Sequence, residues 1–408
     1  MGAQKTFLYT GSWGNREQKG HGTGVSVFRF NSDNGAFDFE MTLPVDEPGI
    51  LAVSPDKRFL YAVNEMTVFP DGEFATGGGV TAMRIDPESG HLCRINQTCA
   101  LGSLPAYLTV DPTGEFVCCA IHGSFAVTSR YVRQEDGSFR CVKTFDTSGV
   151  SLFRVREDGG VLPGCDLDIY QTVGSYETYK HDLSLANHGF PGSRVAPPEI
   201  FQTRPHAHSI NFHPCGLGVV CERGSDMLYL YEIDREAGLL RRVFSYHARL
   251  GTAPRHLAFH PTLPYFYITN EMESSVTVFR FDPAGKSFSE IQSIRTLPKN
   301  ATCKNAPSDI HVHPSGRFVY ASNRGDDSIA VYRVDEETGL LAVQQILPLG
   351  EPSPRGFDIS PDGAFLVVGN MDSDRLASYR IDGQTGELTD SGQRAQAATP
   401  TCVRFVTL

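Results

Sequence analysis

The sequence predicts an all-β fold built from one four-stranded unit that is repeated along the chain. Apolar and polar residues alternate in short runs, for example over residues 25–30 and 275–281, and a period of two is typical of half-buried β-strands. No stretch shows apolar residues at the spacing of an amphipathic helix. The 40 glycines and 25 prolines are spread along the chain rather than collected in a linker, which is typical of many short strands joined by turns.

One phrase recurs six times, and it sets the length of the unit. The first copy, PGILAVSPDKRFLYAVNE at residues 48–65, shows an apolar strand, a turn and a second apolar strand. The six copies begin at Pro48, Pro105, Pro205, Pro254, Pro307 and Pro354. Most lie roughly 50 residues apart and are followed by two weaker strands, which is typical of a β-propeller blade. The longer interval between Pro105 and Pro205 predicts an insertion in blade two, at roughly 124–203.

The two ends of the chain predict a seventh blade. Residues 400–408 contain only the first strand of a unit, whereas residues 6–12 resemble a second strand, with the third and fourth near 24–30 and 37–43. A C-terminal strand that joins the N-terminal blade closes the ring and removes exposed sheet edges. We therefore predict a seven-bladed β-propeller with four antiparallel strands per blade, and residues 1–408 as a single domain.

Composition disfavours several classes of function. The 408 residues carry 36 Lys and Arg against 47 Asp and Glu, a net charge of −11, which disfavours binding to nucleic acid or to an anionic membrane. No apolar stretch reaches the ~18–20 residues of a membrane helix, and the first residues lack the apolar run of a signal peptide. Ten cysteines without a CxxC pair indicate reduced thiols. We expect a soluble, cytoplasmic protein without a cofactor.

Strand geometry predicts that charged residues meet at one face of the disc. Strand one begins and strand two ends on the same face, because the two strands run antiparallel. In blade four this places Arg255 against Glu271. The same construction predicts the rest of this rim: His208 with Glu222, Asp309 with Arg324, Arg355 with Asn370, and Glu65.

These residue types suit acid–base chemistry on an anionic substrate. Arginine offers a planar fork to carboxylate or phosphate, histidine titrates near neutrality, and cationic donors stabilise the oxyanion of an opening lactone. Structural interpretations stay open beside this one. Arg255 and Glu271 would form a plain salt bridge, Asp309 would only hold Arg324 in place, and Glu222 would be either a wall of the site or a structural acceptor.

Most of the other histidines are expected to be structural. Three of them lie at His-Pro turns on the opposite face: His213, His260 and His313. His256 is expected within the packing of its blade. His206 and His208 are two apart on a strand and so face one side, as metal ligands would. Because no third ligand is evident, we predict no metal site.

The sequence resembles the seven-bladed-propeller lactonase family over the whole chain, apart from the extra segment in blade two. That family includes bacterial propeller-type 6-phosphogluconolactonases and fungal 3-carboxy-cis,cis-muconate cyclases. The stretches that carry the resemblance are RPHAHS at 204–209, APRHL at 253–257 with NE at 270–271, and SDIH at 308–311 with SNRG at 322–325. The single tryptophan, Trp13, and the lack of a GH…WD signature disfavour the WD-repeat type.

The resemblance also implies roles for the rim residues. In the cyclase members a histidine, two arginines and a glutamate are implicated in the site, and their motifs match His208, Arg255, Arg324 and Glu271, which we expect to be catalytic. His206 completes a His-x-His pair typical of the lactonases. One departure lies at 121–123, where Ile-His-Gly replaces an asparagine-containing turn. The residues expected to bind substrate are His206, Glu222, Asp309, Arg355 and Asn370.

The function implied by the resemblance is hydrolysis of a sugar lactone, with 6-phosphogluconolactone as the leading substrate. The arginines would hold the anionic group and the carbonyl oxygen, while His208 or Glu271 activates water. Two alternatives stay open: a cyclase or isomerase that forms or opens a muconolactone-type ring, and a non-catalytic propeller that binds an anion or a protein. A rim of Arg, His and Glu favours a small anionic ligand. Residues 171–203 fit either a rim loop or the outer edge, and the oligomeric state stays open.

Overall fold

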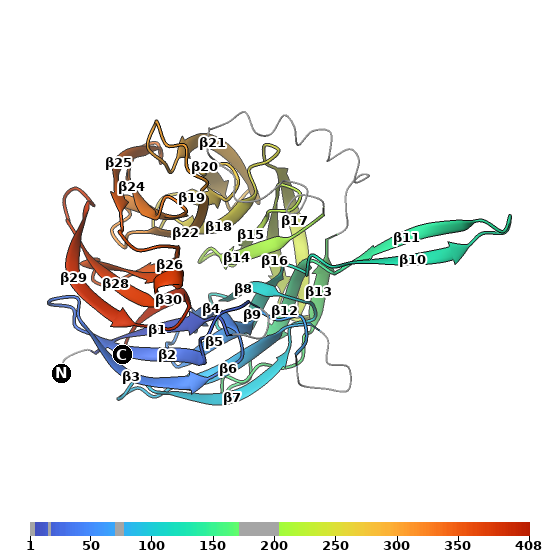
Figure 1. Ribbon diagram of the computed structural model, residues 1–408, viewed down its shortest axis with the longest axis horizontal. Coiled ribbons are helices and arrows are strands. Elements are labelled where there is room, and N and C mark those ends of the chain that lie inside the picture. The colour runs from blue at the N-terminus through green and yellow to red at the C-terminus, as the bar shows by residue number, and fades with distance from the viewer. Residues whose placement is uncertain (1–4, 15–17, 70–76, 171–203) are drawn as a thin grey trace.

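The computed structural model describes residues 5–14, 18–69, 77–170 and 204–408. Seven four-stranded sheets of antiparallel strands stand around a central axis (Figure 1). This arrangement confirms the predicted all-β, seven-bladed propeller. The helical content of the described residues is a single short 3₁₀ turn, η2 (Met371–Ser373).

The first three blades follow the predicted repeat. Blade one contains β4 (Pro48–Val53), β5 (Phe59–Asn64), β6 (Gly79–Ile85) and β7 (Leu92–Cys99). Blade two contains β8 (Pro105–Val110), β9 (Phe116–Ile121), β12 (Gly149–Arg154) and β13 (Asp166–Ile169). Blade three contains β14 (Ala207–Phe212), β15 (Gly218–Glu222), β16 (Met227–Asp234) and β17 (Leu239–His247). In each blade the strand named first is the innermost.

Blades four to six repeat the pattern without insertions. Blade four contains β18 (Pro254–Phe259), β19 (Tyr265–Asn270), β20 (Ser275–Asp282) and β21 (Ser287–Arg295). Blade five contains β22 (Ala306–Val312), β23 (Phe318–Arg324), β24 (Ser328–Val334) and β25 (Leu341–Pro348). Blade six contains β26 (Pro354–Ile359), β27 (Phe365–Asn370), β28 (Arg375–Ile381) and β29 (Leu388–Gln396).

The seventh blade joins the two ends of the chain, as predicted. Its inner strand is β30 (Pro400–Thr407), and the other three are β1 (Thr6–Ser12), β2 (Gly24–Phe30) and β3 (Phe37–Pro44). β30 pairs antiparallel with β1 along the whole length of β1, from Thr6 opposite Thr407 to Ser12 opposite Pro400. The ring is therefore closed by backbone hydrogen bonds between segments at opposite ends of the sequence.

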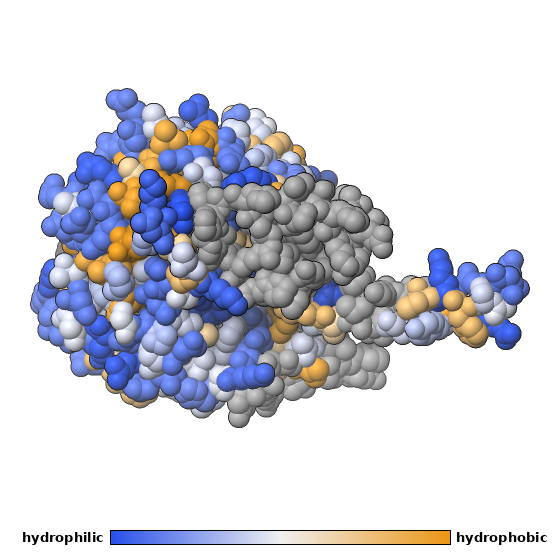
Figure 2. Space-filling view, turned by 45° about the horizontal axis from the view of Figure 1, so that its top comes forward, coloured by the Kyte–Doolittle hydropathy of each residue, from blue (hydrophilic) through white to orange (hydrophobic). Residues whose placement is uncertain are grey.

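Blade two carries an additional hairpin. β10 (Val127–Arg133) and β11 (Phe139–Phe145) lie between β9 and β12 in the sequence and, among the described strands, pair only with each other. They project away from the disc (Figure 1, Figure 2). The range 124–203, expected to be an insertion, also contains two strands of the blade itself, because β12 pairs with β9 and β13. Residues 171–203 lie outside the described residues.

Tyrosines of the second strands tie four of the blades to the next one. Four hydroxyls donate to glycine carbonyls of the following blade, at 2.8, 3.0, 3.4 and 2.8 Å: Tyr9 to Gly90, Tyr61 to Gly159, Tyr267 to Gly339 and Tyr320 to Gly386. Gly159 shows why the acceptor is glycine: its φ is 84°, and a Cβ there would lie 2.2 Å from the ring of Phe59. Any other residue at this position would strain the backbone and collide with that ring.

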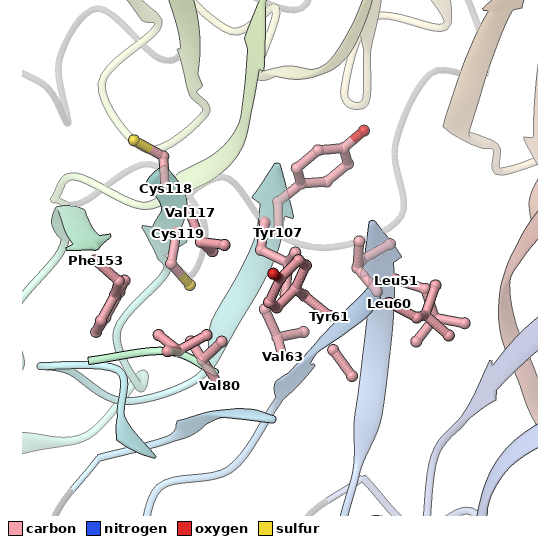
Figure 3. Packing of buried hydrophobic residues seen from close by; sticks show 14 of the residues in the cluster. Leu51, Leu60, Tyr61, Val63, Val80, Tyr107, Val117, Cys118, Cys119 and Phe153 are labelled. Atoms are coloured by element: carbon pink, nitrogen blue, oxygen red, sulfur yellow. The ribbon is translucent and has the colours of Figure 1, made fainter. Parts of the chain in front are cut away.

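The core fills the space between adjacent blades with apolar side chains. Figure 3 shows this packing for blades one and two, where Tyr61, Val80 and Phe153 are fully buried. Cys118 and Cys119 of β9 point to opposite sides of the strand, as the alternation of a strand requires. All ten cysteines are free thiols.

Removing residues 399–408 should destabilise the whole ring, because β1 and β26 would lose the strand that lies between them. We expect an insoluble protein, or one with a much lower melting temperature, measured by circular dichroism. Replacing the hairpin at 127–145 by a short glycine-serine linker is the control, since this hairpin pairs with no blade. A truncated chain that melts like the parent would contradict the closure argument.

Candidate functional site

Every inner strand begins with the same irregularity, a β-bulge. In blade four Pro254 lies opposite Asn270, but Leu257 lies opposite Ile268, so the inner strand contains one extra residue. The same shift occurs in all seven blades. A bulge re-aims side chains, and here two neighbours, Arg255 and His256, contact each other through Nη1 and Nε2 at 3.1 Å. In a regular strand they would point to opposite faces.

The pairing register aligns the seven blades and defines two rows of residues at one face of the disc. The channel row is the residue after the last paired position before the bulge of each inner strand: Gly49, Ala106, His208, Arg255, Ser308, Arg355 and Thr401. The rim row is the residue after its partner on strand two: Glu65, His122, Arg223, Glu271, Arg324, Met371 and Trp13. Equivalent backbone bonds support this alignment, because the N–H of Arg223 donates to His206 O at 3.1 Å and that of Glu271 to Ala253 O at 2.9 Å.

Glu271 is the centre of the charged cluster. Its carboxylate forms an ion pair with Arg223, accepts a hydrogen bond of 2.6 Å from Arg324 Nη2, and lies 3.7 Å from Arg255 Nε. Burial alone would raise the pKa of Glu271, but Arg223, Arg324 and Arg255 outweigh it and hold the pKa well below its usual range. Glu271 is therefore a permanent anion at neutral pH.

Two of these arginines also contact a histidine. Arg223 Nη2 lies 2.7 Å from His122 Nε2, in the same way that Arg255 Nη1 lies beside His256 Nε2. The Nδ1 of His256 lies 2.9 Å from Asp309 Oδ1. Arg255 also donates to the carbonyl of Ser308, so its guanidinium is held by three different groups.

His208 and His206 are buried beside this cluster. Burial, Arg255 and Arg223 lower the pKa of His208 well below its usual value, and the buried Nδ1 of His208 has no hydrogen-bond partner in the described part of the chain. Burial and Arg223 lower the pKa of His206 to about 3. His206 Nδ1 lies 2.8 Å from the carbonyl of His122, while none of the described residues pairs with its Nε2. Both rings are neutral at pH 7.

Arg355 lies on the other side of the mouth and is supported by an aromatic ring. Its Cζ lies 3.8 Å from the centroid of Trp13, a cation–π contact, and Trp13 Nε1 donates to Glu65 Oε2 at 2.9 Å. Burial and Arg324 lower the pKa of Arg355 to about 10, although Glu65 acts in the opposite direction. Burial raises the pKa of Glu65. Among the described residues, the guanidinium of Arg355 has no hydrogen-bond acceptor.

The structure brings together five of the predicted residues in the charged cluster, His208, Arg255, Glu271, Arg324 and His206, and it places a sixth, Arg355, on the other side of the same mouth. It corrects the predicted pair of His208 with Glu222. In blade three the inner strand is in register from Ala207 rather than Pro205, so Glu222 falls one position before the rim row. Its carboxylate accepts from the backbone N–H groups of His206, Gly224 and Ser225 at 2.5, 2.6 and 2.9 Å. Glu222 is a structural acceptor.

Asp309 also differs from the prediction, because it does not contact Arg324. It lies one residue deeper than the channel row, where it holds His256 and lies 3.3 Å from His311 Nε2 through Oδ2. Burial would raise its pKa, but His311 and the hydrogen bond from His256 hold it well below the usual range. The deeper channel is polar too, since half-buried His311 lies 3.6 Å from Asp358.

Asn370 is the last residue of β27 and lies one position before the rim row. The equivalent Asn270 donates to Ser275 Oγ and Thr277 Oγ1 of the third strand at 2.8 and 2.7 Å. Blade six has Arg375 and Ala377 at the matching places, so the buried amide of Asn370 has no hydrogen-bond partner within the described ranges. The rim row of this blade contains Met371 instead.

Sequence reasoning missed Arg223, His122 and the channel position of His256. The signal for the first two was present in the repeat, because the rim-row residue is charged or histidine in five consecutive blades: Glu65, His122, Arg223, Glu271 and Arg324. The channel position of His256 could not be inferred from strand alternation, because only the bulge turns this side chain into the channel. The histidines at the turns are structural as expected, and His260 and His313 bind Gly316 and Gly363 carbonyls of the next blade at 2.9 and 3.0 Å.

A separate cavity of about 430 Å³ lies at the turns of blades two to four, near Thr113, Cys215 and Lys286. It is on the opposite face from the charged cluster and contains none of its residues. In the part of the chain that the structure describes, no three His, Cys, Asp or Glu side chains converge as metal ligands would. None of the described residues belongs to a helix with the length and hydropathy needed to cross a bilayer.

Comparison with known proteins agrees with this fold. The family model described as lactonase, 7-bladed beta-propeller, matches residues 8–162 and 170–405. The chain belongs to this lactonase family. A 6-phosphogluconolactonase of Bacillus subtilis is 29% identical over 341 residues, which cover 83% of this chain and 82% of that protein.

Two further relatives extend the comparison. A 6-phosphogluconolactonase of Formosa agariphila is 27% identical over 363 residues, covering 86% of this chain and 85% of the relative. The structure of a periplasmic gluconolactonase of Pseudomonas aeruginosa has a TM-score of 0.78 and 25% identity, with 99% of each chain covered. The similarity therefore spans nearly the whole propeller.

A double-mutant cycle tests whether Arg223 and Glu271 depend on each other. Arg223→Met should lower the free energy of unfolding by about 3 kcal/mol, because a buried ion pair is broken. The double variant with Glu271→Gln should lose less stability than the two single variants lose together, with a coupling free energy of about 1–3 kcal/mol, measured by urea denaturation. The control is the exposed pair of Arg156 and Asp158, for which we expect no measurable coupling. Equal coupling in the two cycles would contradict the geometry.

Proposed function

We propose that the protein is a lactonase that hydrolyses an anionic sugar lactone, with 6-phosphogluconolactone as the leading substrate. The observation that carries the proposal is the juxtaposition of three arginines around Glu271 with a buried neutral histidine, His208, beside two of them. The names of the curated relatives support the same substrate class. A site of this kind binds an anion and stabilises the oxyanion that forms when water attacks the lactone carbonyl.

The two groups that could activate water differ in proton affinity. Glu271 is held as an anion by its arginines and is a poor base. His208 is neutral and its Nδ1 has no partner among the described residues, so we assign it as the base that accepts the proton of the attacking water. Bound substrate anion would offset the charges of Arg255 and Arg223 and so raise the pKa of His208 in the complex.

The arginines would divide the work. Arg223, Arg324 and Arg255 contact Glu271, and they stabilise the oxyanion from one side. Arg355 has no hydrogen-bond acceptor of its own in the described structure, and its plane is held against Trp13. A guanidinium with free donors matches a phosphate or carboxylate, so Arg355 would anchor the anionic group of the substrate.

A cytoplasmic location is part of the proposal. It is supported by the free state of all ten cysteines, of which Cys118, Cys119, Cys221 and Cys402 are buried. Cell fractionation with an antibody against the protein tests it, and recovery in an extracytoplasmic fraction would contradict it.

Arg324→Ala and Glu271→Gln test the site by their rates. Each should lower kcat on 6-phosphogluconolactone on the order of 10²-fold, because each removes charge that acts in the transition state. Glu271→Gln keeps the shape, so it should change kcat far more than KM. The control is His313→Gln on the opposite face, which should keep the parental rate. Folded variants that turn over like the parent, or an inactive His313→Gln, would refute the assignment.

The pH dependence of hydrolysis should identify the base. The limb of kcat/KM on the acid side reports the free enzyme, and the pKa of His208 is lowered there, so the neutral form persists as the pH falls below 6.5. We expect this limb well below pH 6.5. In the complex the pKa is higher, so the limb of kcat should appear at higher pH than that of kcat/KM. Coincident limbs near pH 6.5 would contradict the role of His208.

A further inference from the structure

Two of the arginines that hold Glu271 are themselves held by histidines. His122 Nε2 lies 2.7 Å from Arg223 Nη2, and His256 Nε2 lies 3.1 Å from Arg255 Nη1. Both histidines are buried, at 5% and 3% exposure. His122 follows the second strand of blade two and His256 lies in the inner strand of blade four, yet they make the same contact. This repetition indicates a shared role rather than accidental packing.

The contacts determine the tautomer of each ring. A guanidinium only donates hydrogen bonds, so each Nε2 must accept, and the ring proton must be on Nδ1. That proton has an acceptor in both cases. His122 Nδ1 lies 2.7 Å from Gly123 O, and His256 Nδ1 lies 2.9 Å from Asp309 Oδ1. Both rings are therefore neutral Nδ1–H tautomers.

A neutral acceptor has an advantage at this position. A carboxylate would fix the arginine but cancel its charge, and a protonated histidine would repel it. Burial and Arg255 lower the pKa of His256 to about 3, and burial, His206 and Arg223 lower that of His122 well below its usual value. The rings therefore accept a hydrogen bond at neutral pH and leave the positive charge of each guanidinium available to a ligand.

We propose that His256 and His122 are positioning residues that fix the guanidinium planes of Arg255 and Arg223, with Asp309 selecting the tautomer of His256. The inference that the guanidinium planes must be fixed rests on the proposed lactonase function. The Nδ1–H tautomer of the two histidines rests only on their hydrogen-bond contacts. Asp309 contacts His256, His256 contacts Arg255, and Arg255 lies beside Glu271. Asp309 therefore acts on the charged cluster through His256. A histidine with a purely structural role would need only the shape of its ring, for example to pack against Tyr107, whose ring centroid lies 5.0 Å from that of His256.

Two amide substitutions of His256 separate these roles. Gln places its carbonyl oxygen near the position of Nε2 and can still accept from Arg255. Asn places its amide near Nδ1 and can still donate to Asp309, but it is too short to reach Arg255. Both remove the ring, so a role in packing alone would affect them alike. His260→Gln is the control, because His260 binds a carbonyl at a turn on the opposite face.

The activity measurement compares the variants on 6-phosphogluconolactone. We expect His256→Asn to lower kcat/KM about 10- to 100-fold through misplacement of Arg255, His256→Gln to stay within about threefold of the parent, and His260→Gln to change only the melting temperature. Equal losses in the Gln and Asn variants, or parental activity in both, would overturn the proposal.

The tautomer of His256 is measured in the resting protein by two-dimensional ¹H–¹⁵N NMR of the histidine ring nitrogens. The signals of His256 are identified as those that disappear in the His256→Gln variant. We expect the neutral Nδ1–H pattern at pH 7. An Nε2–H pattern, or a doubly protonated ring, would overturn the inference. This measurement needs no substrate, so a parent protein that hydrolyses no lactone would refute the proposed function and leave the histidine assignment to the NMR result.

Discussion

The β-bulge at the start of each inner strand is the feature on which the site depends. A regular strand would expose only alternate residues to the channel, and Arg255 and His256 would lie on opposite sides of β18. The bulge inserts one residue, so two consecutive side chains face the same space. The same insertion in blade three aims His208 at the cluster. The chemistry at the mouth is therefore a consequence of a backbone irregularity that all seven blades share.

Buried charge sets the second constraint. Isolated buried ions are costly, and they persist only when paired or hydrogen-bonded. Glu271 is the common partner of Arg223, Arg324 and Arg255, which leaves an excess of positive charge at the mouth. The four neighbouring histidines stay neutral, since burial and the arginines lower their pKa values. The excess charge remains available for an anionic ligand.

The fold could be predicted from the sequence because the repeat is direct. Each copy contains its own turn, and the lone strand at residues 400–408 has one place to pair. The pair of Arg255 and Glu271 followed from the same logic, because Pro254 opens strand one and Asn270 ends strand two. In blade three the same reasoning placed Glu222 at the rim, one residue before the one that lies there. The first paired residue there is Ala207, two positions after the repeat proline, and a one-residue change of register replaces Glu222 by Arg223 at the rim.

The contacts of Asp309 could not be predicted from strand alternation, since the bulge breaks that alternation. Asp309 and Ser308 are neighbours in the sequence, yet Ser308 offers its carbonyl to Arg255 while Asp309 binds His256. Only the three-dimensional structure shows which member of such a pair reaches which partner. The repeat predicts where polar residues gather, and the bulge decides what they touch.

The site also depends on how the sevenfold repeat is broken. The channel row carries long or ring-bearing side chains in blades three, four and six, as His208, Arg255 and Arg355, and short ones elsewhere, such as Gly49. Gly49 is required to be small, because a Cβ there would lie 2.4 Å from Glu65 Oε2. Glu65 in turn receives the indole N–H of Trp13, whose ring supports Arg355. An absent side chain in one blade thus makes room for the groups that orient an arginine in another, and the asymmetry gives a symmetric scaffold a directional binding site.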